Sequence, residues 1–376
     1  MSPSSTSSAS SVPAGPAVPA GPAFPAAGWA AVAELHHRFL TGAILTMVSR
    51  RGGPVAADVV FGLFRRQHLQ KFLPGLAKLG LDDRPDAVKA ASYHYLANAV
   101  GGVLVELVVE HDRKAWVRFV PPRWMYDGVA ICGVPSEVSR AVLHGWYGHN
   151  GVSLGNPRLR FVCTGQTMDG QAGLSGYFEE LDRNVGADER VVFAPGEEPP
   201  RFDPAAVPVL PASTWPATRL AKAARNYAMD YVANLLPQMA ARLGPAEAAH
   251  LGRITGRLVG MSYGAAVIGM LDGPAGWPGA GPHGIARVFG ALAGAMDDDV
   301  EVACRDDGTA EVRMHTWRLM RDVPGPWSPA CFDGWNGLFE GIAEVHDRFT
   351  RIEVTARLDD GDDRFAWRIR PRPRRV

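Results

Sequence analysis

Residues 105–125 read VELVVEHDRKAWVRFVPPRWM, and residues 300–320 read VEVACRDDGTAEVRMHTWRLM. Each stretch has two β-type runs on either side of a short polar turn, HDRK at 111–114 and DDGT at 306–309, which is typical of a β-hairpin. Offset by 195, the stretches are identical at eight of 21 positions, where unrelated sequences would share about one or two. The identical pairs are Val105/Val300, Glu106/Glu301, Asp112/Asp307, Ala115/Ala310, Val117/Val312, Arg118/Arg313, Arg123/Arg318 and Met125/Met320. The sequence therefore predicts an internal duplication.

The sequences around the two hairpins agree in the same order. Upstream, ILTMVSRRGGPVAADVV (44–60) aligns with LLPQMAARLGPAEAAHL (235–251), and in both a Gly-Pro step after an amphipathic run predicts one helix ending and another beginning. Downstream, each half has a cysteine that opens a helical stretch, Cys132 or Cys331. A strand (RLRFVC or RIEVTA), an Asp-Gly turn and an aromatic strand (GYFEEL or RFAWRI) then follow. Each half therefore reads helix, helix, long helix, hairpin, helix, hairpin.

Strands paired locally through tight turns indicate antiparallel sheets, so the predicted fold class is α+β, with two duplicated units related by a pseudo-twofold axis. Residues 1–28 consist almost entirely of Pro, Ala, Ser and Gly and are predicted to be a disordered tail. The first unit then spans 29–184 and the second spans 218–376. The Pro-rich, aperiodic segment 185–217 between them is predicted to be a linker.

Composition restricts the partners and the compartment. Thirty-nine basic residues balance 39 acidic ones, which argues against a dedicated nucleic-acid binder. We find no run of about 20 apolar residues and no secretory signal pattern, so we expect no membrane association. Four scattered cysteines indicate neither a disulfide framework nor a zinc site, and the expected location is the cytoplasm. Only five basic residues are lysine, a bias that suits a bacterium with a GC-rich genome.

Polar residues suited to chemistry are concentrated in the first unit. A cysteine thiolate beside a histidine is a standard nucleophilic arrangement, and histidine moves protons near neutral pH. We therefore assign Cys132 as nucleophile or polar lining, His149 as general base, and Asn150 and His94 as orienting groups. The residues expected to contact substrate are Tyr93, Asn98, Trp146, Cys163 and Gln166. No metal site and no cofactor are expected.

Each of these assignments has a structural alternative. Cys132 would equally suit a core, and Cys163 is in phase with Leu159 and Phe161 on a strand that faces a core. His149 and Asn150 fit a helix-ending turn, and His94 fits a satisfied hydrogen bond. His36-His37 are expected at the surface or at a rim, Asp297–Asp299 in a solvated turn, 271–284 in a loop over the second unit, and 368–376 in a frayed tail.

The order of these pieces resembles the superfamily of four-vinyl-reductase domains and L-2-amino-thiazoline-4-carboxylic acid hydrolase-like proteins. The similarity covers most of both units and is carried by Trp124 to Cys132 and RLRFVCTGQTMDGQ (158–171), with Trp317 to Cys331 and RIEVTARLDDGDD (351–363) as a weaker counterpart. It implies small-molecule binding, or hydrolysis that opens a cyclic C=N–S unit, with Cys132 at a functional position and Cys331 as its copy. The chain departs from that family by having two units, of which the second lacks the GHN and CTGQ pieces.

Two functions follow as hypotheses. The first is a cofactor-independent enzyme of bacterial secondary metabolism that hydrolyses, opens or closes a heterocyclic or acyl small-molecule substrate, with the second unit as a degenerate copy. The second is a non-catalytic sensor or carrier that uses the same pocket. Haem binding ranks third, because histidines are present but no motif marks a ligand. The sequence leaves monomer and homodimer open.

Overall fold

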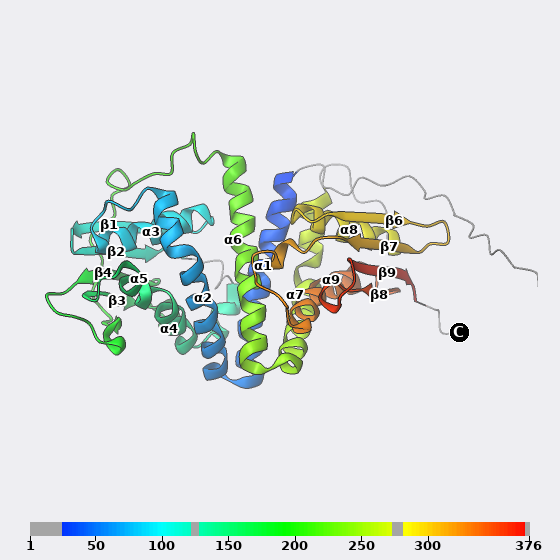
Figure 1. Cartoon of the computed structure of the whole chain (residues 1–376), viewed down its shortest axis with the longest axis horizontal. Coiled ribbons are helices and arrows are strands. Elements are labelled where there is room, and N and C mark those ends of the chain that lie inside the picture. The colour runs from blue at the N-terminus through cyan, green and yellow to red at the C-terminus, as the bar shows by residue number, and fades with distance from the viewer. Residues whose placement is uncertain (1–24, 122–127, 273–280, 373–376) are drawn as a thin grey trace, which may run out of the picture.

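The computed structural model describes residues 25–121, 128–272 and 281–372, which form two lobes on either side of a pair of long helices (Figure 1). The first half of the chain contributes α1 (Pro25–Arg51), α2 (Gly53–Leu79), α3 (Asp86–Val100), β1 (Val105–His111), β2 (Lys114–Phe119), η2 (Gly128–Gly133), α4 (Ser136–Gly145), η3 (Tyr147–His149), α5 (Asn150–Leu154), β3 (Leu159–Gly165), η4 (Thr167–Asp169), β4 (Ser175–Glu180), η5 (Ala187–Glu189) and β5 (Val191–Phe193). Its strands form one sheet in the order β1-β2-β4-β3-β5, and every neighbouring pair is antiparallel except β3 and β5.

The second half has the same order of main helices and hairpin strands, without counterparts of η3, α5, η5 and β5 among the described residues. It contains α6 (Ala217–Leu243), α7 (Pro245–Asp272), α8 (Pro282–Ala295), β6 (Val300–Cys304), β7 (Ala310–Met314), η7 (Arg318–Met320), α9 (Pro329–His346), β8 (Thr350–Ala356), η8 (Leu358–Asp360) and β9 (Phe365–Pro371). The strands form an antiparallel sheet in the order β6-β7-β9-β8. The prediction of an α+β fold with two antiparallel hairpins in each half is therefore confirmed. The longest helices are the first two of each half, whereas the sequence predicted the third.

The two sheets also share their register. Glu106 lies opposite Arg118 in the first hairpin, and Glu301 lies opposite Arg313 in the second. Arg118 Nε lies 2.7 Å from Glu106, and Arg313 Nη1 lies 3.7 Å from Glu301, so the identical residues of both hairpins make the same cross-strand ion pair. The order and register are those that two copies of one unit would have. Duplication itself stays a prediction.

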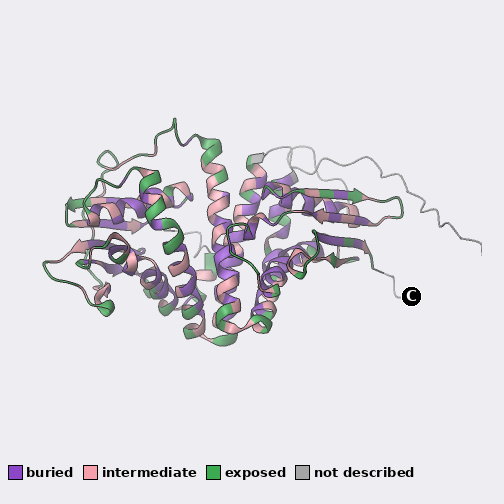
Figure 2. Cartoon of the chain, viewed as in Figure 1, coloured by how far each residue is buried: buried purple, intermediate pink, exposed green. Residues whose placement is uncertain are grey.

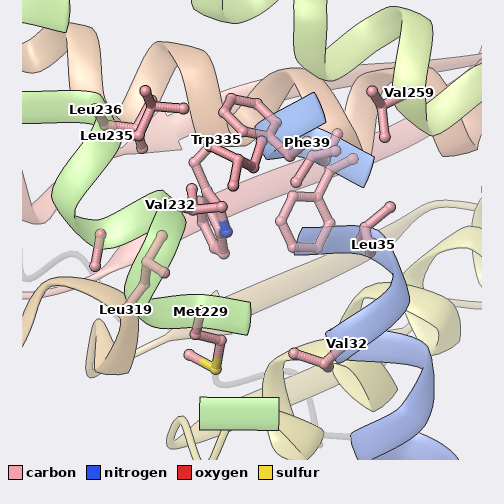
Figure 3. Packing of buried hydrophobic residues seen from close by; sticks show 14 of the residues in the cluster. Val32, Leu35, Phe39, Met229, Val232, Leu235, Leu236, Val259, Leu319 and Trp335 are labelled. Atoms are coloured by element: carbon pink, nitrogen blue, oxygen red, sulfur yellow. The ribbon is translucent and has the colours of Figure 1, made fainter. Parts of the chain in front are cut away.

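The first helix of each half packs against the other half. Helix α1 contacts α6, α7 and α8, while α6 contacts α2 and α3. The Gly-Pro steps make this exchange possible, because Gly52 (φ 89°) and Gly244 (φ 83°) turn the chain sharply between consecutive long helices. Figure 3 shows Phe39 of α1 and Val232 of α6 meeting around Trp335 of α9, all three fully buried. The contact joins the two halves rather than separating them.

One hydrophobic core consequently spans both predicted units. It takes residues from α1, α2, α4, α6, α7, α8 and α9 and from the second sheet, and it runs through the centre of the molecule as the buried zone of Figure 2. The first sheet has a second core with α3 and η3. The predicted boundaries at 29–184 and 218–376 therefore describe the order of the chain, but they do not describe separately packed bodies.

Helices α7 and α9 approach so closely that their backbones touch along a stripe of glycines. A Cβ added to Gly256 would lie 2.7 Å from the Gly334 carbonyl oxygen and 2.7 Å from backbone atoms of Gly337 and Leu338. Gly252 faces Gly334 in the same way, at 2.9 Å from its Cα. Only residues without a side chain allow this separation, so the glycines of α7 fix how α9 lies against it.

Several segment predictions need correction at their boundaries. Helix α1 begins at Pro25, so residues 25–28 are helical and not part of a disordered tail; residues 1–24 lie outside the described range. Within the predicted linker, Val191–Phe193 pairs with β3 because three apolar residues can extend the sheet edge. Strand β9 continues to Pro371, so much of the predicted C-terminal tail is sheet. Of the predicted 271–284 loop, residues 273–280 are not described.

Helix α7 has the length and apolarity of a membrane span. Within Pro245–Leu271, an 18-residue window has a mean hydropathy of 1.3, and 39% of that window is buried inside the protein. It is the single such helix among the described residues, and α9, α1 and α6 pack against it. Part of the apolar surface of α7 is therefore buried in contacts with other helices of the same chain.

Asp298 is buried, although the sequence predicted a solvated turn for Asp297–Asp299. Only 7% of Asp298 is exposed, and its Oδ1 accepts hydrogen bonds from Thr316 Oγ1 (2.9 Å) and the Arg318 backbone N–H (2.6 Å). Its Oδ2 has no partner among the described residues. The expectation was wrong because the turn folds back over the start of η7 and uses this carboxylate to hold it.

We expect Asp298 to make stability depend on pH. Burial raises the pKa of the Asp298 carboxyl to about 6. The two hydrogen bonds that this carboxylate accepts lower the pKa, but their effect is smaller than that of burial. A raised carboxyl pKa means that ionisation opposes folding above pH 6 and that this penalty disappears as the pH falls. From pH 7 to pH 4, the free energy of unfolding of the wild type should rise by about 2 kcal/mol relative to Asp298→Asn. Urea denaturation at both pH values measures this, and a difference that is independent of pH would contradict it.

Candidate functional site

A cavity of about 660 Å³ lies between the first lobe and the long helix that begins the second half. Its walls come from α2, α3, η3 and α6, and the η7 segment contributes Leu319 and Val323. Aromatic and aliphatic side chains dominate, among them Tyr93, Trp146 and Tyr227. Because α6 packs on α2 and α3, both halves of the chain are needed to enclose the cavity.

A hydrogen-bonded chain of polar groups crosses one wall of the cavity. Tyr231 donates through its hydroxyl to the Tyr227 hydroxyl (2.8 Å), and Tyr227 donates to Asn98 Oδ1 (3.0 Å). Asn98 then donates from Nδ2 to the His94 carbonyl oxygen (2.6 Å). Asn98 is therefore oriented from both sides, and the chain fastens α6 to α3.

His94 lies on the cavity wall with its ring enclosed by other rings. It stacks on Tyr147 at 4.0 Å between centroids and on Phe178 at 5.5 Å. The side-chain nitrogen of Asn150 lies 3.0 Å from His94 Nε2, whereas the sequence predicted that Asn150 would orient His149. Asn150 is fully buried, and its Oδ1 has no partner among the described residues. The arrangement fixes the plane of the imidazole at the edge of the cavity.

An ion pair links two helices at the rim of the cavity. Lys71 Nζ of α2 lies 2.7 Å from Asp230 Oδ2 of α6, and both side chains are about one third to one half exposed. Tyr93, which lines the cavity below, donates its hydroxyl to the Lys71 carbonyl oxygen at 3.3 Å. Burial raises the pKa of the Tyr93 phenol, so this hydroxyl is a neutral donor.

The predicted nucleophile does not lie in this cavity. Cys132 is exposed on the 3₁₀ helix η2, and the described lining contains neither it nor any other cysteine, serine or threonine. Cys163 faces the core of the first sheet with Leu159 and Phe161, and burial raises the pKa of its thiol to about 12. A thiol with so high a pKa is not ionised near neutral pH and is a poor nucleophile.

The remaining predicted site residues divide between the cavity and its surroundings. Tyr93, His94, Asn98 and Trp146 line it, and all four come from α3 or the turn after α4. His149 is not part of the described lining; its Nδ1 lies 2.9 Å from the His144 carbonyl oxygen, and its ring lies 6.2 Å from that of His68. Gln166 is held in the η4 turn by Asp169 (3.0 Å). The structure thus groups four of the nine predicted residues around one cavity.

Sequence reasoning missed the residues that α6 contributes. Tyr227, Asp230 and Tyr231 recur at helical spacing, which is a pattern shared with many core helices, so nothing marked them as cavity residues. No local pattern revealed the burial of the α1 histidines either.

His36 is buried with its Nδ1 2.8 Å from the Val32 carbonyl oxygen, and burial lowers its pKa to about 4. The expectation of a surface or rim pair was wrong for His36, because α1 is enclosed by the second half.

The chain matches no family model, no curated protein and no solved structure. The resemblance to four-vinyl-reductase and hydrolase-like domains therefore stays a prediction. Any function has to be argued from the cavity itself.

Proposed function

We propose that the protein binds a small, largely apolar organic molecule in the cavity between α2, α3 and α6. The observation that carries this proposal is the cavity: its volume of about 660 Å³ is within the range of roughly 300–1,000 Å³ for small-molecule sites. Such sites combine apolar walls with a few fixed polar groups. Here the fixed groups are Asn98 and Tyr227, which the hydrogen-bonded chain holds in place.

The walls favour a flat ligand with at least one polar group. Tyr93 and Trp146 have nearly parallel rings, 6.3 Å apart at 22°, and both line the cavity. Aromatic surfaces of this kind bind planar or heterocyclic molecules through offset contacts. The side chains of Gln67 and Asn226 at the lining are amides, which can donate and accept and so suit a carbonyl or ring nitrogen.

Hydrolysis of such a ligand is the second proposal, and His94 is the observation that favours it. Asn150 donates from its amide nitrogen to His94 Nε2; once this hydrogen bond opens, Nε2 would take a proton from water, whose oxygen would then attack an electrophilic carbon of the ligand. As the bond between that carbon and the leaving group breaks, His94 would give the proton to the leaving atom. No thiol or aliphatic hydroxyl lines the described cavity, so this route uses water in place of a covalent intermediate.

Binding can be tested with a neutral apolar dye, N-phenyl-1-naphthylamine. Ala97→Trp places an indole in the cavity from the wall of α3 and should weaken dye binding at least about tenfold, as measured by fluorescence titration. The matched control is Ala99→Trp, which puts the same side chain on the exposed face of the same helix and should leave the dissociation constant unchanged. Equal affinities for both variants and the wild type would refute the proposal.

The same protein separates binding from catalysis. Mass spectrometry of the purified chain should find a co-purifying small molecule, which Ala97→Trp no longer retains. Incubation of that molecule with the wild type distinguishes the two proposals: recovery at the same mass supports binding alone, whereas one product or two products whose total mass is greater by one water support hydrolysis. In the latter case His94→Gln should abolish product formation.

A further inference from the structure

Basic side chains gather where α2 packs against residues 144–153, outside the cavity. Arg65 and His68 lie three residues apart on α2 and therefore share a face. The His149 ring is 6.2 Å from that of His68, and His68 Nε2 is 2.8 Å from Ser153 Oγ. Two segments that are distant in the chain thus bring their polar groups to one place. A third segment contributes Arg190.

Glycines in the 144–153 segment bring the arginines close. A Cβ on Gly145 would lie 3.1 Å from the Arg65 backbone nitrogen, and a Cβ on Gly148 would lie 3.6 Å from Arg190 Cβ. Arg65 and Arg190 therefore both pack against the turn that carries His149. We name Arg65, His68, His149 and Arg190 the basic cluster.

The basic cluster has no carboxylate to balance it. Among the described residues, neither Arg65 nor Arg190 forms an ion pair, whereas Arg158, Arg160 and Arg183 of the same lobe each pair with a glutamate. The charges that act on the cluster come from its own members. Burial and then Arg65 lower the pKa of His149, and burial and then Arg190 lower that of Arg65.

Two guanidinium groups without a counter-charge repel each other, which costs folding free energy. In addition, one of them has an unsatisfied hydrogen-bond donor. Arg65 Nη1 is buried with no hydrogen-bond partner among the described residues, and the same is true of His68 Nδ1. A bound anion removes both deficits, because it supplies negative charge and several acceptor oxygens at once. Arginine forks match the geometry of tetrahedral oxyanions especially well.

We infer that the basic cluster is a binding site for a small oxyanion of the phosphate type, held by Arg65 and Arg190. The site is separate from the cavity, since His68 packs edge-on against Trp146 at 5.7 Å and Trp146 forms the wall between them. The inference is independent of the proposed function, so either can fail without the other.

Isothermal titration with inorganic phosphate, at ionic strength held constant with sodium chloride, tests the site. The expected result is saturable binding of one phosphate per chain with a dissociation constant below about 10 mM. Arg190→Gln and Arg65→Gln should each weaken it at least about tenfold. The matched control is Arg183→Gln, because Arg183 pairs with Glu189 close by and should not contribute.

A thermal melt without phosphate distinguishes a binding role from a structural one. If the cluster binds anions, Arg65→Gln should keep or raise the melting temperature of the phosphate-free protein, and added phosphate should raise the wild-type value only. A lowered melting temperature with unchanged phosphate affinity would overturn the proposal. So would the absence of saturable binding to the wild type. If Arg65→Gln does not fold, Arg190→Gln decides the question.

Discussion

Gly256→Ala is expected to lower the free energy of unfolding by about 3 kcal/mol, and Gly256→Leu to prevent folding altogether. The added Cβ would meet three backbone atoms of α9 at 2.7 Å, and backbone cannot move aside as a flexible side chain can. Helices α7 and α9 would have to separate, which opens the core around Trp335. The loss occurs although alanine favours a helix over glycine by about 1 kcal/mol.

Gly269→Ala on the same helix is the matched control. A Cβ at Gly269 meets no atom within 4 Å, so only the helix propensity changes and stability should rise by up to about 1 kcal/mol. Urea denaturation followed by circular dichroism measures both variants. Opposite signs for Gly256→Ala and Gly269→Ala are the expected outcome, and equal effects would mean that the glycine contact does not set the α7–α9 distance.

Asp297→Asn is expected to cost about 2 kcal/mol of stability, because it leaves the buried Arg225 without its counter-charge, while the 40% exposure of the carboxylate to water reduces the loss. Arg225 is completely buried in α6, and its Nη2 lies 2.8 Å from Asp297 Oδ2 at the end of α8. Asp297 has φ 67°, a left-handed conformation that asparagine also tolerates, so the substitution changes the charge and keeps the backbone. The effect should appear as a lower urea midpoint at pH 7.

Lys222→Ala tests the second cation that pairs with the Asp297 carboxylate. Lys222 Nζ lies 3.1 Å from the same carboxylate but is about half exposed, so its removal should cost less than about 1 kcal/mol. The Arg225 hydrogen bond chiefly lowers the pKa of Asp297 to about 2. The stabilisation is therefore present at neutral pH and down to about pH 4, and is lost as the pH falls toward 2. Equal, small losses for both variants would contradict this account.

How much the sequence predicted depended on how far apart the contacting residues lie. Hairpins 105–119 and 300–314 were predicted correctly because their strands and turns are adjacent in the chain, and alternation and turn residues are local signals. The placement of His94 and Asn98 on one helix face follows from helical periodicity in the same way. Both residues indeed line the cavity.

The predicted grouping of Cys132 with His149 rested on chemical plausibility, and the chain order says nothing about their distance. In the structure, Cys132 is exposed on η2, whereas His149 packs against Phe61 and His68 of α2. Likewise, no local pattern could reveal that Tyr227 donates to Asn98, 129 residues away. Such contacts depend on which helices pack together.

By itself, the sequence determined the order of helices and strands, the antiparallel hairpins and the Gly-Pro breaks between long helices, because each is set by residues within a few positions of one another. Only the tertiary structure decided that α1 and α6 cross to the opposite halves, that α6 closes the cavity, and that Arg65 and Arg190 lie together without an acid. These outcomes depend on the fit of whole surfaces, which the burial of a shared core selects.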